Sequence, residues 1–545
     1  MRPSRLALVG CVLLACAAGA DGADPADWTR GARIVGNGLE REHIPDIIRE
    51  AQDAHAQGIE VDNDITGRYE SLLDPAAKLE DLRLMAQAAH AAGLHTFVYI
   101  AGLECITGNA EKREHTLLQD HPDWVQRDRQ GRPAVFGGGT AFWIEPGDED
   151  VWVTPFAVAW RTLYMERVRQ IAATGVDGIY VDIPYWMTHF DGWEDRWPSF
   201  DAATVAEFRR RTGRDALTGV KLGEADDPGF RSWVEFRIDA ITEFMAEIAR
   251  TAKAVNPACL TIAEIYPGYD DGAIRTGADV YRLCPVVDVI AHEFDGGEGI
   301  AALKSPRDWA RFSAGMDAFR AFAGDRPTWM LAYSWDGQKE VPPREAMLTL
   351  ACAEVMAGAS DWDPHGHVMD GTNDAPARTE IFAWIEAHRE VFYAPRVPLA
   401  PVEIRFDPAA RNRNPGVYAE SFTREIVKCL RGHRAFQVVT PRSPFTPGTG
   451  PGVEVQAPPT VLARIALVNG HPHAFLFNTA GLEAGKRLDP LPVRRVGVAF
   501  PAGRASRVMC LPFMGEVRQL MGVVARGRLR AELPPIGRGM VVWCE

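Results

Sequence analysis

The sequence has few cysteines and no cysteine-based framework. Only 9 of its 545 residues are Cys. No CxxC pair or short Cys/His cluster occurs, which excludes a zinc knuckle and does not indicate a disulfide scaffold. Cys11 and Cys16 lie in an apolar N-terminal segment, so an odd number remains in the rest of the chain. We expect most of these to be small buried hydrophobic residues, with one or two disulfides as the alternative.

An excess of basic charge is also missing. The chain has 59 basic and 73 acidic residues and a net charge of −14. This balance argues against a nucleic-acid partner and against docking on anionic lipid, because both need a basic face. No apolar run after the N-terminal segment reaches the ~20 residues of a membrane span, so no integral span is expected. The hydrophobic fraction of 46% and charged fraction of 24% exclude a disordered or fibrous chain.

Residues 1–20 are predicted to be a signal peptide. Arg2 and Arg5 precede an apolar stretch that ends near Leu14, and small residues follow. An alternative interpretation is a bacterial lipobox at residues 13–16, which would leave a lipidated Cys16. Both interpretations predict an exported protein, periplasmic or extracellular, and the second makes it a lipoprotein.

Strand-like and helix-like segments alternate over residues 31–392. The predicted strands are 32–36, 58–63, 95–101, 177–183, 260–266, 287–294, 328–334 and 358–362. The predicted helices are 43–57, 76–92, 159–174, 230–255, 306–323, 344–357 and 378–391. Eight strands in series predict a (β/α)8 TIM barrel of the α/β class. A doubly wound open sheet is the rival fold, but there is no glycine-rich phosphate loop to favour it.

The remaining chain is predicted to form two smaller parts. Residues 393–445 read as a small, partial α/β segment, and the Pro- and Gly-rich stretch 442–459 as a linker. Residues 460–545 contain short alternating runs separated by turns, which predict an all-β accessory domain resembling a small sandwich.

Two strand-to-helix connections, 102–158 and 184–229, are unusually long. In a barrel they would lie on the face that carries active sites, and we expect them to form ordered walls. They contain six of the 15 Trp residues, namely Trp124, Trp143, Trp152, Trp186, Trp193 and Trp197. Trp can stack on the apolar face of a sugar ring, and the alternative role is packing within the loops.

Acidic residues follow seven of the eight predicted strands. They are Asp62, Asp64, Glu104, Asp182, Glu264, Glu293, Asp336, Asp361 and Asp363. Hydrolysis of a glycosidic bond needs two carboxyl groups, one to protonate the leaving oxygen and one to act as nucleophile or base. We predict that Asp182 and Glu264 are this catalytic pair, because they end neighbouring strands.

Each of these two residues has an alternative role. Asp182 could cap a loop, and Glu264 could be the buried partner of an Arg such as Arg237. Glu293 and Asp336 are the alternative candidates for a catalytic carboxyl.

A further set of residues is predicted to bind substrate. It consists of Asp62, Asp64, Glu104, Trp143, Trp186, His292, Glu293, Trp335 and Asp336. Asp62 and Asp64 could instead stabilise a turn, and His292 could be a core or rim residue. No metal site and no cofactor are predicted, because the candidate His pair after the last barrel strand, His365 and His367, fits a turn better than a ligand set.

Two segments resemble known families. The run GVDGIYVDIPYW (175–186) resembles the fourth-strand block of α-amylase-like barrel glycoside hydrolases, and IAEIYP (262–267) resembles their fifth-strand block. The resemblance implies that Asp182 is the nucleophile and Glu264 the acid/base.

The order of the domains is similar to that of family 42 β-galactosidases and of related uncharacterised bacterial glycosyl hydrolases. Segments 93–104 and 121–134 also resemble the latter.

The chain departs from both patterns. Tyr180 stands where the α-amylase pattern has Arg, and Ser334-Trp335-Asp336 replaces its His-Asp. Val181-Asp182 stands where family 42 has Asn-Glu. The sequence therefore predicts a glycosidase without indicating its sugar.

Two alternatives to this hypothesis remain. One is a carbohydrate-binding envelope protein that has lost the chemistry of its barrel. The other is a metal-dependent hydrolase acting through His365 and His367.

Overall fold

Eight parallel strands close into a barrel in the computed structural model. The model describes residues 27–545 apart from 63, 142, 189, 266–268, 294–301, 325, 332–342, 364–373, 400–401, 446–451 and 503–506. The barrel order is β1-β11-β10-β9-β8-β7-β3-β2. The strands are β1 (Arg33–Gly38), β2 (Gly58–Asp62), β3 (His95–Ala101), β7 (Gly178–Asp182), β8 (Leu260–Ile265), β9 (Val289–Glu293), β10 (Thr328–Leu331) and β11 (Ser360–Asp363). Each overlaps a predicted strand, so the predicted barrel is confirmed.

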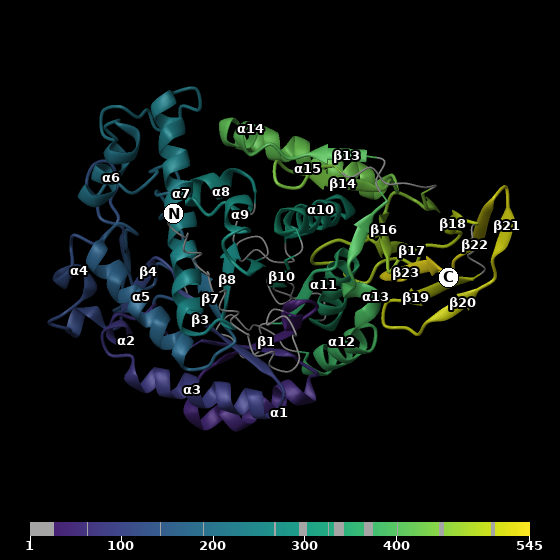
Figure 1. Ribbon diagram of the computed structural model, residues 1–545, viewed down its shortest axis with the longest axis horizontal. Coiled ribbons are helices and arrows are strands. Elements are labelled where there is room, and N and C mark those ends of the chain that lie inside the picture. Colours follow the sequence, from purple (N-terminus) through teal and green to yellow (C-terminus); the bar gives the residue numbers. More distant parts are fainter. Residues whose placement is uncertain are drawn as a thin grey trace, which may run out of the picture.

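Helices surround the barrel (Figure 1). Those of the barrel layer are α1 (Ile44–Asp53), α3 (Ala76–Ala91), α5 (Val158–Ala173), α7 (Pro228–Val255), α10 (Pro306–Ala323), α11 (Pro343–Ala357), α12 (Ala375–Ala387) and α13 (Arg389–Tyr393). The 28-residue helix α7 begins where sequence signals place it. The Asp227 side chain accepts the N–H of Phe230 at 2.8 Å, and Pro228 occupies the first turn.

Among its described residues, the connection from β8 to β9 has no long helix of its own and contains the short helices α8 (Asp271–Thr276) and α9 (Val280–Leu283). Helix α15 (Pro415–Arg431), from the later α/β segment, packs against α10 and α8 and covers this part of the barrel. The Tyr269 hydroxyl lies 2.6 Å from that of Thr423 on α15, and Arg311 on α10 pairs with Glu420 at 2.6 Å. The α/β segment thus completes the helix layer around the barrel. The boundaries predicted for this segment stay a prediction.

The two long connections are ordered walls, as predicted. The first contains η3 (Ala110–Lys112), α4 (Leu117–Asp120) and an antiparallel sheet in the order β4-β6-β5. Its strands are β4 (Glu104–Thr107), β5 (Val135–Gly137) and β6 (Glu149–Trp152). The second connection contains α6 (Ala202–Thr212). Phe190 from the second wall packs on Phe136 from the first, with ring centroids 4.3 Å apart, so the walls share an aromatic core.

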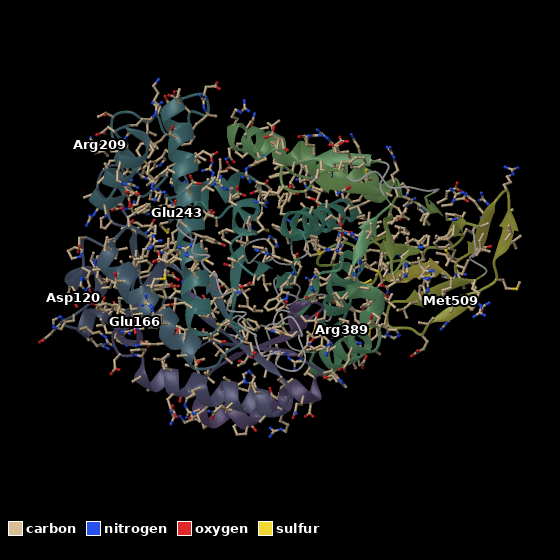
Figure 2. All side chains as sticks on the ribbon, viewed as in Figure 1. Asp120, Glu166, Arg209, Glu243, Arg389 and Met509 are labelled. Carbon is tan, nitrogen blue, oxygen red and sulfur yellow. The ribbon has the colours of Figure 1, made fainter. Side chains whose placement is uncertain are left out.

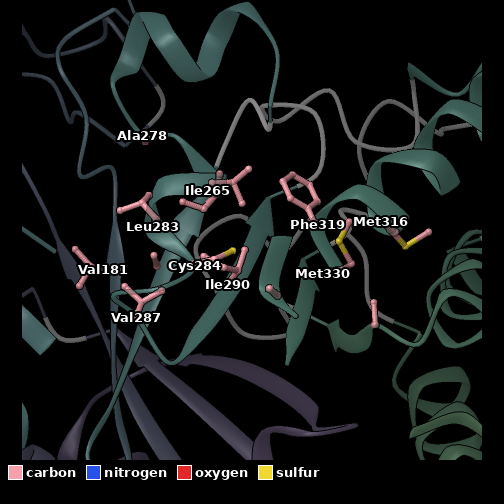
Figure 3. Packing of buried hydrophobic residues seen from close by; sticks show 14 of the residues in the cluster. Val181, Ile265, Ala278, Leu283, Cys284, Val287, Ile290, Met316, Phe319 and Met330 are labelled. Atoms are coloured by element: carbon pink, nitrogen blue, oxygen red, sulfur yellow. The ribbon is translucent and has the colours of Figure 1, made fainter. Parts of the chain in front are cut away.

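Side chains of the strands alternate between the barrel interior and the helix layer. Trp28, Phe97, Tyr180 and Trp329 are among the residues that fill the interior. Residues one position away point outward, and Figure 3 shows Met330 of β10 beside Phe319 and Met316 of α10. This alternation determines which residues at the strand ends can face a common site.

Two antiparallel sheets form the C-terminal part. One has the order β12-β16-β17-β23-β19-β20 and the other β15-β18-β22-β21. Their strands are β12 (Arg396–Pro398), β15 (Glu454–Gln456), β16 (Val461–Val468), β17 (His471–Asn478), β18 (Gly497–Pro501), β19 (Val508–Pro512), β20 (Arg518–Leu520), β21 (Val523–Ala525), β22 (Arg528–Glu532) and β23 (Gly539–Cys544). The sheets share a hydrophobic core, as predicted for a sandwich-like domain.

Part of the predicted linker is wrong. Residues 454–456 form the edge strand β15, which pairs with β18. The preceding α/β segment has β13 (Val402–Arg405) parallel to β14 (Phe436–Val439), with α14 (Pro408–Arg413) and α15 between them.

All seven Cys residues after position 100 are buried and unpaired, as predicted for small hydrophobic side chains. Among the described residues, no helix combines the length and apolarity needed to cross a bilayer. Charged side chains such as Asp120, Glu166 and Arg209 lie at the periphery of α4, α5 and α6 (Figure 2).

Candidate active site

The predicted catalytic residues end two adjacent strands of the barrel. Val181 of β7 lies opposite Ala263 of β8, so Asp182 and Glu264 follow at the same level. On the other side of β7, Asp182 lies opposite Ala101 of β3. Both residues therefore lie at the carboxyl ends of parallel strands, where barrels carry their active sites.

Asp182 is half-buried and accepts a hydrogen bond from Tyr99. The Tyr99 hydroxyl donates to Oδ2 of Asp182 across the β3–β7 pair. Burial, together with the charges of Asp182 and Asp62, raises the pKa of Tyr99 well above its usual value. Tyr99 therefore remains a protonated donor at all ordinary pH values and orients the carboxylate.

Glu264 is only 1% exposed and is tied to the chain segment that follows Asp182. Its Oε2 accepts the backbone N–H of Ile183 at 3.3 Å and the hydroxyl of Tyr185 at 3.2 Å. Ile183 has a φ of 42°, which is strained for a β-branched residue. Strained residues of this kind are found mainly at functional sites. One residue thus links the two predicted catalytic carboxyls.

The Arg237 alternative for Glu264 is wrong. The buried Arg237 guanidinium donates to the carbonyl oxygens of Pro198 at 2.6 Å and Ile274 at 3.1 Å, and also to that of Arg275. These bonds hold the second wall against α8.

Asp62 ends β2 beside Tyr99, and Asp64 follows the strand. Asp62 lies opposite Tyr99, and its Oδ1 accepts the N–H of Asp64 at 3.1 Å. Burial, with the charge of Asp64, raises the pKa of Asp62 to about 7. Asp64 is more exposed and lies near two cations, Arg68 at 3.8 Å and Lys78 at 3.6 Å. Asp62 is therefore a carboxyl that can exchange a proton near neutral pH.

Glu60 is a buried carboxyl that the sequence analysis missed. It precedes Asp62 by two residues and so faces the interior one layer deeper. It is 1% exposed, and neither oxygen has a hydrogen-bond partner among the described residues. Burial, with the charges of Asp62 and Asp182, raises its pKa well above the usual range. The alternation of inward and outward side chains along strand 58–62 is the sequence feature that could have indicated the burial of Glu60.

Glu104 lies at the base of the first wall. Its Oε1 accepts the indole N–H of Trp143 at 3.0 Å. Burial raises the pKa of Glu104 to about 7, and the charge of Asp182 contributes to the rise. Glu104 therefore lies within electrostatic range of Asp182. Its neighbour Asp150, on β6, was also missed.

Part of the chain matches a known family model. Residues 73–268, which include Asp182 and Glu264, match the family model described as Glycosyl hydrolase-like 10. A search of curated proteins finds no match.

Solved structures of glycosidases have the same fold over nearly the whole chain. An α-L-fucosidase isoenzyme 2 from Paenibacillus thiaminolyticus is 11% identical with a TM-score of 0.59, covering 94% of this chain and 99% of that one. A β-galactosidase from Bacillus circulans sp. alkalophilus is 10% identical with a TM-score of 0.60, covering 94% and 99%. A GH42 β-galactosidase from G. stearothermophilus is 10% identical with a TM-score of 0.61, covering 94% and 98%.

The fold is that of the glycoside hydrolase barrels. The predicted resemblance is confirmed at this level. In this glycoside hydrolase-type barrel, Asp62, Asp182, Glu264 and Glu104 gather at the carboxyl end of the strands.

Most of the predicted aromatic lining of the glycosidase-type barrel is core. Five of the six wall tryptophans are at most 5% exposed, namely Trp124, Trp152, Trp186, Trp193 and Trp197. Trp186, which was predicted to bind substrate, is 0% exposed, and its indole N–H donates to the Arg237 carbonyl at 3.0 Å. Trp186 therefore packs the wall. Trp143 alone of the six is partly exposed.

His292 faces the helix layer and not the carboxyls. It lies opposite Ile265 and Met330, which both point outward, and its ring centroid is 4.3 Å from that of Phe319 on α10. Burial lowers the pKa of His292 to about 3, so the ring is neutral. It borders a cavity of about 600 Å³ between α10 and α15.

Some predicted residues lie outside the described residues. These are Trp335, Asp336, His365 and His367, together with the side chains of Glu293, Asp361 and Asp363. Within the described part of the chain, no three His, Cys, Asp or Glu side chains are grouped to hold a metal ion.

Proposed function

We propose that the protein is an exported glycoside hydrolase that uses Asp182 and Glu264. The observation that carries this proposal is the link between the two carboxyls through Ile183, at the ends of adjacent strands. Adjacent strands lie ~4.8 Å apart, a spacing that favours the short carboxyl separation of retaining glycosidases. The export signal at residues 1–20 is part of the same proposal.

The two carboxyls would act in two steps. Glu264 gives its proton to the leaving oxygen while Asp182 attacks the anomeric carbon and the glycosidic bond breaks. Water then attacks the same carbon, Glu264 takes the proton from that water, and Asp182 leaves. Tyr99 holds Oδ2 of Asp182, so Oδ1 is the attacking oxygen.

A carbohydrate-binding protein without catalysis is the second candidate. The observation that favours it is the burial of Glu264, which is only 1% exposed. In a hydrolase, the leaving oxygen of the substrate would have to reach this carboxyl.

A panel of nitrophenyl glycosides separates the two candidates. The panel includes β-D-galactosides, α-L-fucosides and α-glucosides, and the same sugars are tested for binding by calorimetry. Release of nitrophenol from one glycoside supports the hydrolase. Binding without release supports the second candidate, and the absence of both contradicts the proposed function.

A further inference from the structure

The first wall contains two buried carboxyl groups that face each other. Glu104 lies opposite Trp152, and Ile106 lies opposite Asp150, in the antiparallel pair of β4 and β6. Glu104 and Asp150 are therefore diagonal neighbours on one face of the sheet. Glu104 is 7% exposed and Asp150 is 0% exposed.

Oδ1 of Asp150 is buried and has no donor among the described residues, and the two carboxyls act on each other's pKa. A bond between two carboxyl groups requires a proton, because two carboxylates offer only acceptors. Each carboxyl also receives an indole N–H, Glu104 from Trp143 at 3.0 Å and Asp150 from Trp152 at 3.1 Å. Burial raises the pKa of both groups, that of Glu104 to about 7. The charge of Glu104 adds to the rise for Asp150, whereas contact with Asp150 lowers the pKa of Glu104.

Other charged and titratable groups act on this pair. Arg68 is a cation that acts on both carboxyls, and it is bonded to Asp148 at 2.9 Å. Asp182 on β7, Tyr99 on β3 and Cys105 on β4 also interact with one or both carboxyls. Arg68 is thus shared with other carboxylates, so the proton is what keeps the pair together.

Trp143 depends on this pair for its position. Its indole N–H bonds Glu104, and its ring stacks on Phe190 of the second wall at 6.0 Å with 28° between the planes. It is the partly exposed tryptophan of the walls. A partly exposed indole beside a carboxyl pair is suited to stack on a sugar ring.

We propose that Glu104 and Asp150 share one proton and thereby hold Trp143 as the sugar-stacking surface of the site. They are positioning residues, and Trp143 is the residue that touches the sugar. This role for Trp143 rests on the proposed function. When the shared proton leaves at high pH, two buried anions repel each other and Trp143 loses its fixed partner.

The proton sharing is tested on the free protein by tryptophan fluorescence. The difference between wild type and Trp143→Phe isolates the signal of Trp143, and we expect that signal to change in one step near or above about pH 7. Asp150→Asn should shift the step to lower pH, because Glu104 is then the titrating carboxyl of the pair and its ionised form accepts from the amide. Glu149→Gln, at the adjacent position of the same strand, should leave the step at its wild-type pH. A step at the wild-type pH in Asp150→Asn, or no step in wild type, overturns the shared proton.

The positioning role is tested by ligand affinity. Glu104→Ala and Trp143→Ala should each raise KM by about tenfold with kcat nearly unchanged, and the double variant should show no further rise. Glu104→Gln should restore KM, because its amide accepts from Trp143 and donates to Asp150. If no glycoside is cleaved, the dissociation constant of a bound sugar replaces KM. Equal losses in kcat, or a KM unchanged in Glu104→Ala, overturn the positioning role.

Discussion

At the scale of single residues, the orientation of Asp182 depends on Tyr99. Tyr99→Phe keeps the ring in the barrel interior and removes only the O–H donor to Asp182. A hydrogen bond to a charged group contributes about 1.5–3 kcal/mol, so we expect kcat/KM to fall by roughly 10- to 100-fold.

The control for this substitution is Tyr164→Phe. The Tyr164 hydroxyl is also buried, but it donates to the carbonyl of Ala101 at 2.9 Å. This variant should lose stability and keep its kcat/KM. Wild-type activity in Tyr99→Phe would contradict the assigned role of Tyr99.

The sequence allowed Asp182 and Glu264 to be placed because each lies at the carboxyl end of a recognisable strand. Glu60 and Asp150 lie within strands, where the side chain of an acidic residue is expected to point outward to solvent. Only the direction of each side chain, set by pairing, shows that they are buried. The tryptophans were ambiguous for a related reason, since composition does not separate a loop core from an exposed surface.

At the scale of elements, Gly102 allows the first wall to approach β7. Its N–H donates to the Asp182 carbonyl at 2.7 Å, and a Cβ atom there would lie 2.7 Å from that oxygen and 2.8 Å from Cα of Pro184. Both are backbone atoms, so Gly102→Ala must move Asp182. We expect a loss of stability of about 1–3 kcal/mol and a large loss of turnover, measured by denaturation and by initial rates.

Gly137→Ala serves as the matched control. Gly137 lies in β5 of the same wall, and a Cβ atom there would meet nothing within 4 Å. Its stability and turnover should stay near those of wild type. If Gly102→Ala behaves in the same way, the close approach does not position Asp182.

Strands were easier to predict than their connections. The eight barrel strands are short apolar runs whose limits are marked by polar residues, and their positions agree with the structure. The missing helix between β8 and β9 is replaced by α15, about 140 residues later in the chain. Periodicity describes a local segment and carries no information about such a distant partner.

At the scale of the whole molecule, a buried ion pair joins the barrel to the C-terminal sheets. Arg464 on β16 donates to Asp317 on α10 at 2.8 Å and to the Ser313 carbonyl at 3.0 Å. The side chains of Arg464 and Asp317 are 7% and 9% exposed. Arg464→Met leaves Asp317 buried and unpaired, and we expect a loss of about 3–5 kcal/mol in guanidinium denaturation.

Two further variants make this prediction specific. Adding Asp317→Leu to Arg464→Met should recover much of the loss, because the unpaired charge is removed. Glu483→Ala breaks the exposed pair with Lys486 and should cost less than about 1 kcal/mol. An Arg464→Met protein as stable as wild type would show that the ion pair does not join the two parts.

The buried carboxyls also make stability depend on pH. The pKa values of Asp62 and Glu104 are raised to about 7, and those of Glu60 and Asp150 are raised well above their usual values. The folded protein therefore holds protons that the unfolded chain releases near about pH 4, and the stabilisation is lost as pH rises through the folded pKa values.

We expect the raised carboxyl pKa values to lower the free energy of unfolding as pH rises from about 4, where the unfolded carboxyls ionise, to about 7, where Asp62 and Glu104 ionise in the folded protein. Buried His292 and His473, with pKa values lowered to about 3 and about 4, oppose this trend below about pH 6.5, because their rings are charged only in the unfolded chain. Glu60→Gln should reduce the carboxyl contribution to the slope, because an amide does not titrate. A slope unchanged in Glu60→Gln would contradict the protonated state of this carboxyl.

The most direct test of the account is the turnover of Asp182→Asn and Glu264→Gln on the best glycoside of the panel. Each substitution preserves size and removes the charge or the transferable proton. We predict that kcat/KM falls by at least about 100-fold in both variants, while the melting temperature stays close to that of wild type. Near-wild-type turnover in either folded variant would contradict the assignment of Asp182 and Glu264 as the catalytic pair.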